Sequence, residues 1–307
     1  LIDKTNSNYY ELELIKTEIN ISSIELNTTR DTILKLFKRQ IINEKVYNER
    51  LSYELNMIES KDLFSYLLQA IKILELTNDI PHVTRGSCGS SLICYLLGIS
   101  NVDPVKYNIK FSRFLNEYRN NLPDIDFDFP HYKRDEVFIR ISKKWPNQIA
   151  RISNHIHFHQ KSAEREALRK LGYHSFIDKY SVQKTILKLN VYEKIKFDKI
   201  VNELQGTFRT YSLHCGGIVF YPDGVPSELK INNGLIDQVN LDKRDISKDR
   251  NFKIDILSSK GISQLHMYYS SILKELSFSD TMTNQKVFDM FKRGDNIGIT
   301  LAESPLI

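Results

Sequence analysis

The chain has 307 residues, of which 41% are hydrophobic and 26% are charged, which allows one large or two modest domains with a buried core. No segment approaches the roughly 18–20 consecutive apolar residues of a membrane span, and the N-terminal segment is polar, unlike a secretory signal. We therefore expect a cytoplasmic protein, neither membrane-bound nor secreted. The formal net charge of +5 permits a polyanionic partner without requiring one.

The three cysteines, Cys88, Cys94 and Cys215, do not show the short paired spacings of a zinc site or a disulfide framework. We expect each of them to be a small buried residue. This use of cysteine is typical of a reducing compartment.

Helices and strands alternate along the chain after a first segment, 1–30, that is rich in Asn, Thr, Ser and Ile and predicts a short strand or two. Apolar residues three and four positions apart predict helices, which cover 31–58, 63–74, 92–97, 133–145, 161–171, 181–189, 191–204, 262–276 and 285–293. Alternating or continuous apolar runs predict strands, which cover 124–129, 148–158, 217–221 and 251–257. This mixture predicts an α/β or α+β fold.

The segment between Pro123 and Pro130 alternates acidic and apolar residues. Residues two apart on a strand project from the same face, so we expect Asp124, Asp126 and Asp128 to lie together while the residues between them face a core. Three like charges on one face repel each other unless cations neutralise them, and Mg²⁺ prefers carboxylate oxygens. The pattern indicates either a magnesium site or the solvated face of an antiparallel strand.

Lys253 and Asp255 share one face of the strand predicted over 251–257 and supply one more carboxylate. A two-metal site for phosphoryl transfer needs carboxylates that hold two ions about 3.5–4 Å apart, and two adjacent strands can supply them. On its own, a Lys-x-Asp motif on a strand is also typical of an exposed ion pair.

A segment of small residues, Arg85-Gly86-Ser87, leads toward the helix predicted over 92–97. Small residues let backbone N–H groups approach phosphate oxygens, and a helix N-terminus carries partial positive charge, so the segment suits a triphosphate. Such a turn is also common in proteins that bind no phosphate. Arg113 can donate two hydrogen bonds to a phosphate or be an ordinary surface residue.

The order of these elements is that of nucleotidyltransferase palms of the DNA polymerase beta type. The sequence more closely resembles the alpha subunit of bacterial DNA polymerase III, which belongs to the C family of polymerases. The resemblance runs from about residue 35 to the end of the chain and rests on these motifs: Arg85-Gly86-Ser87, Leu97-Gly98-Ile99, Val102-Asp103-Pro104, Arg113-Phe114-Leu115-Asn116, 122–129, Lys133-Arg134-Asp135, 214–219, Asp242-Lys243 and Phe252-Lys253-Ile254-Asp255.

The resemblance implies a polymerase-beta-like nucleotidyltransferase palm, in which a mixed sheet is flanked by helices and interrupted by helical insertions. It also implies a division of the chain into three parts. Residues 1–34 would be the end of an N-terminal domain, 35–281 the palm with a helical insertion at about 160–206, and 282–307 the start of the fingers.

The same resemblance implies a set of site residues, each matched by its motif. Catalytic and metal-binding carboxylates would be Asp124, Asp126 and Asp255, with Asp128 as a neighbour rather than a ligand. The residues that bind the incoming nucleotide would be Arg85, Gly86, Ser87, Arg113 and Lys253.

The implied activity is that of a DNA-directed DNA polymerase that uses two Mg²⁺ ions, with Mn²⁺ as an alternative. The primer 3′-hydroxyl would attack the α-phosphate of a deoxynucleoside triphosphate and release pyrophosphate. Its partners would be primer-template DNA, deoxynucleoside triphosphates and other replisome subunits, with no membrane. Two alternatives stay open: a catalytically impaired scaffold that binds DNA or partner proteins, and a nucleotidyltransferase that needs no template.

Three histidines, His155, His157 and His159, alternate on the strand predicted over 148–158. Alternation would let them share a metal ion. The family that the sequence resembles has no such site, so we expect exposed or partly packed histidines.

Lys161, Arg165 and Arg169 form a basic stripe along one face of a predicted helix. The stripe could follow a DNA backbone. Because acidic residues are interleaved with it, a solvated helix face is an equally good interpretation.

Overall fold

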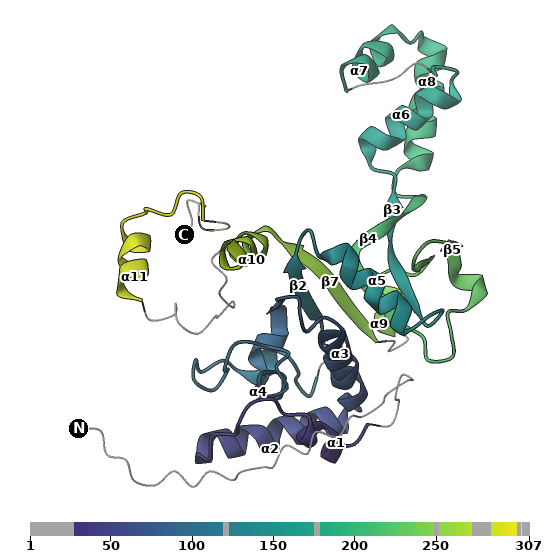
Figure 1. Ribbon diagram of the computed structural model, residues 1–307. Coiled ribbons are helices and arrows are strands. Elements are labelled where there is room, and N and C mark those ends of the chain that lie inside the picture. The colour runs from purple at the N-terminus through teal and green to yellow at the C-terminus, as the bar shows by residue number, and fades with distance from the viewer. Residues whose placement is uncertain are drawn as a thin grey trace.

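A seven-stranded mixed sheet forms the centre of the computed structural model, which describes residues 28–118, 123–174, 179–248, 252–271, 284–299 and 302 (Figure 1). The strand order is β1-β2-β7-β4-β3-β6-β5. β2 pairs with β7 in parallel, as does β3 with β6, whereas the other neighbours are antiparallel. The strands are β1 (Val83–Arg85), β2 (Ile125–Pro130), β3 (Ile149–His157), β4 (Phe208–Phe220), β5 (Lys230–Asn232), β6 (Asp237–Val239) and β7 (Lys253–Ser259).

Helices α1 to α4 gather beneath β2 and β7 in Figure 1, and one apolar core joins them to α5 and the central strands. This arrangement confirms the predicted α/β fold with a mixed sheet and flanking helices. The described helices are α1 (Arg30–Lys35), α2 (Lys45–Ser60), α3 (Phe64–Leu76), α4 (Leu92–Leu96), α5 (Arg134–Lys144), α6 (Gln160–Lys170), α7 (Lys179–Lys188), α8 (Val191–Leu204), α9 (Lys243–Lys248), α10 (Lys260–Ser271) and α11 (Gln285–Lys292), with short 3₁₀ helices η1 (Gly86–Ser90), η2 (Phe111–Arg113) and η3 (Ser227–Leu229).

The single helix predicted over 31–58 is wrong, because α1 and α2 divide this segment. Between them the backbone N–H groups of Lys38 and Arg39 donate to the carbonyl of Leu96, at 2.8 and 3.2 Å. The Arg39 guanidinium also donates to the carbonyl of Ser100 at 2.6 Å. These contacts satisfy the carbonyl of the last residue of α4 and a carbonyl in the loop after it. Hydrophobic periodicity carries no information about such long-range contacts.

Strands β3 and β4 extend beyond the sheet as a two-stranded stem, and α6, α7 and α8 cap its tip (Figure 1). The three helices enclose a small apolar core of their own. Since β4 spans Phe208–Phe220, the strand predicted over 217–221 covers only its last part. None of positions 208–215 is fully buried, so they lack the hydrophobic pattern from which a strand can be predicted.

The structure also bears on the expectations about the cysteines, the first 30 residues and membrane spans. Cys88 and Cys94 are buried as predicted, but Cys215 is exposed, because it lies where the stem of β4 leaves the sheet. The short strands predicted in the first 30 residues lie outside the described residues, apart from 28–30. None of the described helices is long and apolar enough to cross a membrane.

A fully buried carboxylate, Glu54 of α2, holds the start of α4 in place. Its oxygens accept hydrogen bonds from the Ser91 hydroxyl at 2.7 Å and from the backbone N–H groups of Leu92 and Ile93 at 2.9 and 3.1 Å. The Arg50 guanidinium donates a fourth bond at 2.6 Å. Negative charge at a helix N-terminus is favourable. This contact fixes the end of the η1 segment that precedes α4.

We predict that Glu54→Ala lowers the free energy of unfolding by about 3 kcal/mol, because it leaves the helix N–H groups and Arg50 without their buried partner. Urea denaturation followed by circular dichroism measures this loss. Glu59→Ala on the same helix is the control, since Glu59 is half-exposed in its ion pair with Arg30 and should cost less than about 1 kcal/mol. Equal losses for the two variants would contradict the assignment.

Candidate functional site

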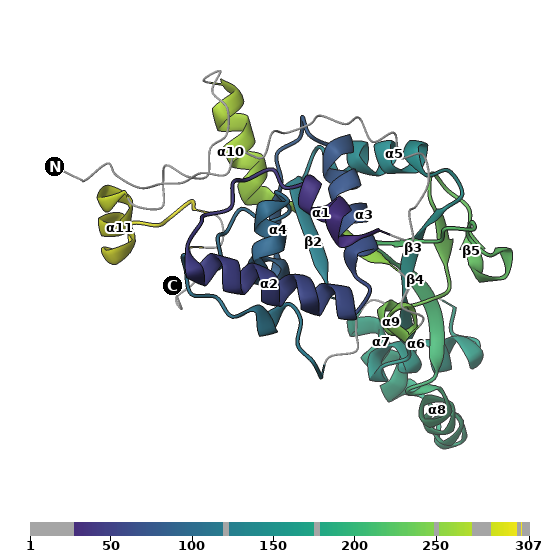
Figure 2. The same cartoon turned by 90° about the horizontal axis from the view of Figure 1, so that it is seen from below.

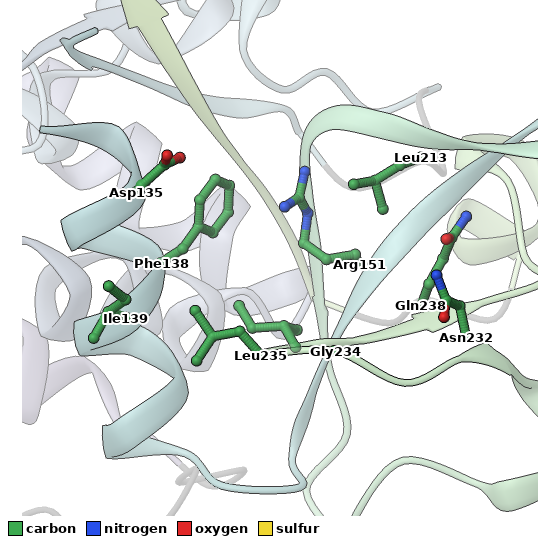
Figure 3. Close-up of a pocket in the computed structure, with 10 residues that line it drawn as sticks. Asp135, Phe138, Ile139, Arg151, Leu213, Asn232, Gly234, Leu235 and Gln238 are labelled. Carbon is green, nitrogen blue, oxygen red and sulfur yellow. The ribbon is translucent and has the colours of Figure 1, made fainter. Parts of the chain in front are cut away.

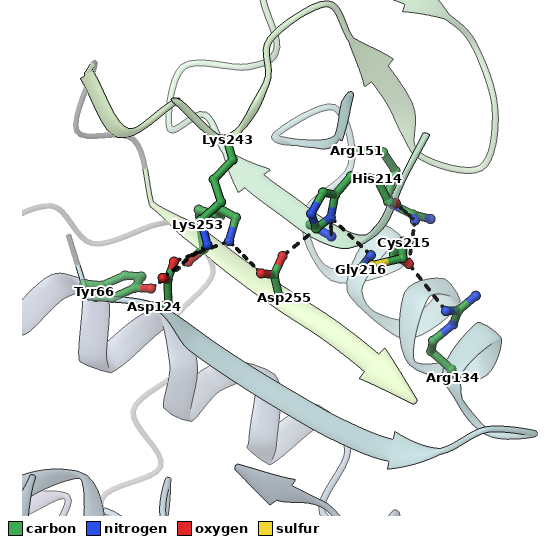
Figure 4. A network of polar contacts seen from close by, with 11 residues as sticks. Tyr66, Asp124, Arg134, Arg151, His214, Cys215, Gly216, Lys243, Lys253 and Asp255 are labelled. Carbon is green, nitrogen blue, oxygen red and sulfur yellow. Dashed lines mark hydrogen bonds and ion pairs between the residues drawn. The ribbon is translucent and has the colours of Figure 1, made fainter. Parts of the chain in front are cut away.

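Parallel pairing of β2 with β7 places two of the predicted carboxylates opposite each other. Asp126 is the Cα partner of Asp255 in the register of these strands. Asp124 lies just before β2 and shares an ammonium partner with Asp255 (Figure 4). The three predicted aspartates therefore come together near the N-terminal ends of β2 and β7.

Two lysine ammonium groups neutralise part of this negative charge (Figure 4). Lys253 Nζ lies 2.6 Å from Asp255 Oδ2 and 3.6 Å from Asp124 Oδ1. Lys243 Nζ lies 3.2 Å from Asp124 Oδ2. Lys253 was predicted as a site residue, whereas no role was predicted for Lys243. Lys243 belongs to the Asp242-Lys243 motif of the resemblance, but the motif does not show that Lys243 lies beside β2 and β7.

The carboxyl of Asp126 has a raised pKa. Burial raises the pKa of its carboxyl to about 6, and the neighbouring charge of Asp255 and that of Asp124 act in the same direction. Lys253 opposes them. A carboxyl in such a position favours either a proton or a cation.

The predicted small-residue segment lies directly against Asp126. Gly86 has φ +80°, and a Cβ atom added there would lie 3.4 Å from Asp126 Oδ2. A positive φ favours glycine, and the 3.4 Å distance shows that a side chain at this position would be in van der Waals contact with the carboxylate. Ser87, the next residue, is half-buried in η1. The structure thus brings Gly86 to the carboxylates, with Ser87 next to it in the chain.

Asp128 stands apart from the other aspartates although it alternates with them on β2. Its side chain is buried and forms an ion pair with Arg85 of the neighbouring strand β1. Asp128 is therefore not a solvated carboxylate, because the Arg85 guanidinium of the paired strand β1 neutralises it, and its expected place as a neighbour of the ligands stays a prediction. The positive charge of Arg85 is in turn neutralised by Asp128.

Arg113 ends η2, and its side chain is exposed. No hydrogen bond or ion pair among the described residues joins it to the three aspartates. Arg113 is therefore not in contact with the three aspartates, and its predicted contact with a nucleotide stays a prediction.

His214 of β4 is a neighbour of the site for which no role was predicted. Its Nδ1 accepts a hydrogen bond from the Gly217 backbone N–H at 2.8 Å and lies 3.8 Å from Asp255 Oδ1. Burial lowers the pKa of His214, which favours the neutral ring that this hydrogen bond requires. A Cβ atom at Gly217 would come within 2.9 Å of His214 Nδ1 and 3.2 Å of Asp255 Oδ1.

Tyr66 of α3 ties together the starts of the two strands. Its hydroxyl lies 2.8 Å from the carbonyl of Pro123 and 2.6 Å from that of Lys253. Tyr66 lies in a helix predicted only as a structural element. The sequence offers no local pattern from which this contact could be found, since it joins residues far apart in the chain.

A second group of possible metal ligands, His155, Asp242 and Asp245, has ligand atoms within 4.8 Å of one another. Their hydrogen bonds already have another role. Asp242 Oδ1 accepts from the backbone N–H groups of Arg244 and Asp245, so it caps α9. His155 Nε2 lies 2.6 Å from the carbonyl of Asn240. Partly packed and exposed histidines are found at 155, 157 and 159, as predicted.

A pocket of about 400 Å³ lies between α5 and the β5–β6 connection (Figure 3). None of its lining residues is a predicted site residue. Arg151 connects it to the site, since Nη2 donates to the carbonyl of His214 at 2.8 Å. The guanidinium also lies over the ring of Phe138, 4.2 Å from its centroid.

The raised pKa of Asp126 generates a prediction about stability and pH. Between about pH 4 and pH 6 the unfolded chain has lost the Asp126 proton while the folded chain retains it, so the stability of the parent falls as pH rises through this window. Asp126→Asn has no proton to lose. In metal-free buffer it should gain about 1 kcal/mol over the parent at pH 7.5, after solvent screening, and nothing at pH 4.

Urea denaturation at the two pH values measures this difference. Asp198→Asn is the control, because Asp198 is an exposed carboxylate on α8. A gain for Asp126→Asn that is equal at both pH values, or a loss at pH 7.5, would contradict the assigned charge environment.

Comparison with known proteins places this arrangement in a family. Residues 25–258 match the family described as the bacterial DNA polymerase III alpha NTPase domain. The chain is 29% identical over 297 residues to DNA polymerase III subunit alpha of Staphylococcus aureus (strain MRSA252), a match that covers 87% of this chain and 28% of that protein. It is 28% identical over 305 residues to the error-prone DNA polymerase of Rhodopseudomonas palustris (strain HaA2), which covers 90% of this chain and 26% of that protein.

The chain thus spans little more than a quarter of the length of these relatives. The family match nevertheless covers most of the chain and contains the acidic strand, the small-residue segment and Asp255. The chain belongs to the family of the bacterial DNA polymerase III alpha NTPase domain, as its motifs had indicated.

Proposed function

We propose that this chain forms the palm of a C-family DNA-directed DNA polymerase, which transfers a nucleotide to a primer 3′-hydroxyl. The single observation that carries the proposal is the pairing of Asp126 with Asp255 across β2 and β7, with Asp124 beside them. The small-residue segment at Gly86 lies against the same carboxylates. Family membership and these contacts support one site rather than scattered acidic residues.

In this proposal Asp124, Asp126 and Asp255 hold two divalent cations, with Mg²⁺ favoured and Mn²⁺ as an alternative. The donor set fits, because it consists of carboxylate oxygens, which hard cations prefer. Asp255 Oδ1 is buried and has no hydrogen-bond donor among the described residues. Bound cations would supply the charge that lowers the pKa of the primer hydroxyl and stabilises the leaving pyrophosphate.

Residues of the chain supply the remaining interactions of the proposed reaction. Backbone N–H groups at Gly86 and Ser87 would donate to triphosphate oxygens, and the Lys253 ammonium would balance their charge. Arg85 and Arg113 are further candidates for phosphate contacts, Arg85 after release from Asp128. The primer 3′-oxygen would attack the α-phosphorus and lose its proton to solvent, while the bond to the β,γ-diphosphate breaks and pyrophosphate leaves with the electron pair.

The partners and the domain division belong to the same proposal. Primer-template DNA and deoxynucleoside triphosphates would be the substrates, and other replisome subunits would be protein partners in the cytoplasm. Residues 35–281 would form the palm, with the helices between β3 and β4 as its insertion at about 160–206. The parts assigned to 1–34 and 282–307 would belong to neighbouring domains.

We predict that the parent chain extends a primer by at least one template-directed nucleotide with Mg²⁺ or Mn²⁺, and that Asp126→Asn slows this addition at least about 100-fold, because a metal-binding carboxylate is lost. Gel electrophoresis of a labelled primer measures the rate. Asp198→Asn should retain the parent rate, since Asp198 lies on α8, outside the group of three carboxylates.

Other outcomes of this experiment identify the alternative functions. Addition of nucleotides without a template would favour a non-templated nucleotidyltransferase. DNA binding without divalent cations, together with no incorporation by the parent, would contradict the proposal and favour a scaffold.

The arm formed by α6, α7 and α8 offers a surface for the DNA backbone. Lys161, Arg165 and Arg169 are exposed on α6, whereas Ala163 and Ala167 of the same helix are buried in the arm's core. The basic stripe therefore points away from the arm's interior. We propose that it contacts phosphates of the duplex.

We predict that replacing the three basic residues of this stripe with Gln weakens duplex binding and lowers the slope of log K against log salt by about 2–3, the change expected for three lost phosphate contacts. Fluorescence anisotropy over a salt series measures both quantities. A control variant replaces Lys194, Lys196 and Lys199 of α8 with Gln and removes the same net charge. Equal slope changes in the two variants would show that only net charge matters.

A further inference from the structure

Lys243 reaches the candidate site from outside the two strands that form it. It is the first residue of α9, and its Nζ lies 3.2 Å from Asp124 Oδ2. The other oxygen of the same carboxylate, Oδ1, faces Lys253 Nζ at 3.6 Å. Both oxygens of Asp124 therefore face an ammonium group (Figure 4).

The two lysines are held very differently. Lys253 has a side chain that is 8% exposed, lies on β7 and contacts Asp255 at 2.6 Å, so moving it would leave buried charges unpaired. The Lys243 side chain is 51% exposed. Since it already contacts solvent, it can leave Asp124 with only the small loss of free energy that a partly exposed ion pair represents. Of these two ammonium groups, Lys243 is the one that can be exchanged.

An ammonium group at hydrogen-bond distance from a carboxylate oxygen uses one of the lone pairs of that oxygen. Its positive charge also repels a cation that approaches the same oxygen. A divalent cation at Asp124 Oδ2 therefore competes with Lys243, whereas a cation held only by Asp126 and Asp255 meets less of this repulsion.

We propose that Lys243 is an internal counter-ion that occupies the cation position at Asp124 and competes with the divalent ion for it. The inference rests on the proposed function, which assigns cations to the three aspartates. In the absence of a cation, Lys243 limits repulsion among the carboxylates. Its displacement sets the cation concentration that the site requires and frees an ammonium group beside the place proposed for the triphosphate.

Titration with Mn²⁺, followed by the electron paramagnetic resonance signal of the free ion, tests this competition without any reaction. Lys243→Met should bind Mn²⁺ about fivefold more tightly than the parent, since the competing ion pair is lost. Lys243→Arg, which keeps the charge, and Lys199→Met on α8, which removes the same net charge elsewhere, should remain within about twofold of the parent.

A gain in affinity is an effect that damage to the fold would not produce. Lys243→Gln, which keeps a polar side chain at the start of α9, is a second variant from which the same gain is expected. Unchanged or weaker Mn²⁺ binding in both neutral variants would overturn the inference.

Asp126→Asn, titrated in parallel, separates the two claims. If the parent binds Mn²⁺ and Asp126→Asn does not, the aspartates are the ligands. The Lys243 variants alone then test whether Lys243 competes with the cation. If Asp126→Asn binds Mn²⁺ as the parent does, the aspartates are not the ligands, and the proposed function and the competition are both wrong.

Discussion

Pairing between β2 and β7 is the constraint on which the candidate site depends. Neighbouring strands lie about 4.8 Å apart, so the register that makes Asp126 the partner of Asp255 forces two carboxylates into proximity. The strand starts are held in this register by the Tyr66 hydroxyl, which contacts backbone carbonyls at the beginning of both. A shift by one residue would turn one carboxylate toward the opposite face of the sheet. The fold therefore maintains an arrangement that its own electrostatics oppose.

The surroundings of the carboxylates reduce this opposition without removing it. Lys253 and Lys243 supply two positive charges to three aspartates, which leaves a net negative site. Backbone approaches the carboxylates closely at Gly86 on one side and at Gly217 on the other, where a Cβ atom would lie 3.4 Å and 3.2 Å from the nearest carboxylate oxygen. Side-chain bulk is absent where a substrate phosphate or a cation would need space.

Much of this architecture could be predicted from the sequence, because regular elements leave a periodic pattern. Alternation over 124–129 predicted that the aspartates lie near each other, but not that the exposed Arg85 of β1 forms an ion pair with the buried Asp128. The exposed stem of β4 has no such pattern, and the break between α1 and α2 depends on contacts with a distant helix. Lys243 and His214 reach the site from α9 and β4. Both lie in motifs that resemble the family, but neither motif shows which aspartate its residue contacts.

The central claim is that Asp124, Asp126 and Asp255 form one cation site. The most direct measurement is a crystal structure of this chain grown with Mn²⁺ and recorded near the manganese absorption edge, so that anomalous scattering locates the ion. At saturating Mn²⁺ the account predicts anomalous signal bound by the carboxylates of Asp124, Asp126 and Asp255. A peak only at His155, Asp242 and Asp245, or no peak beside Asp126 at saturating Mn²⁺, would contradict it.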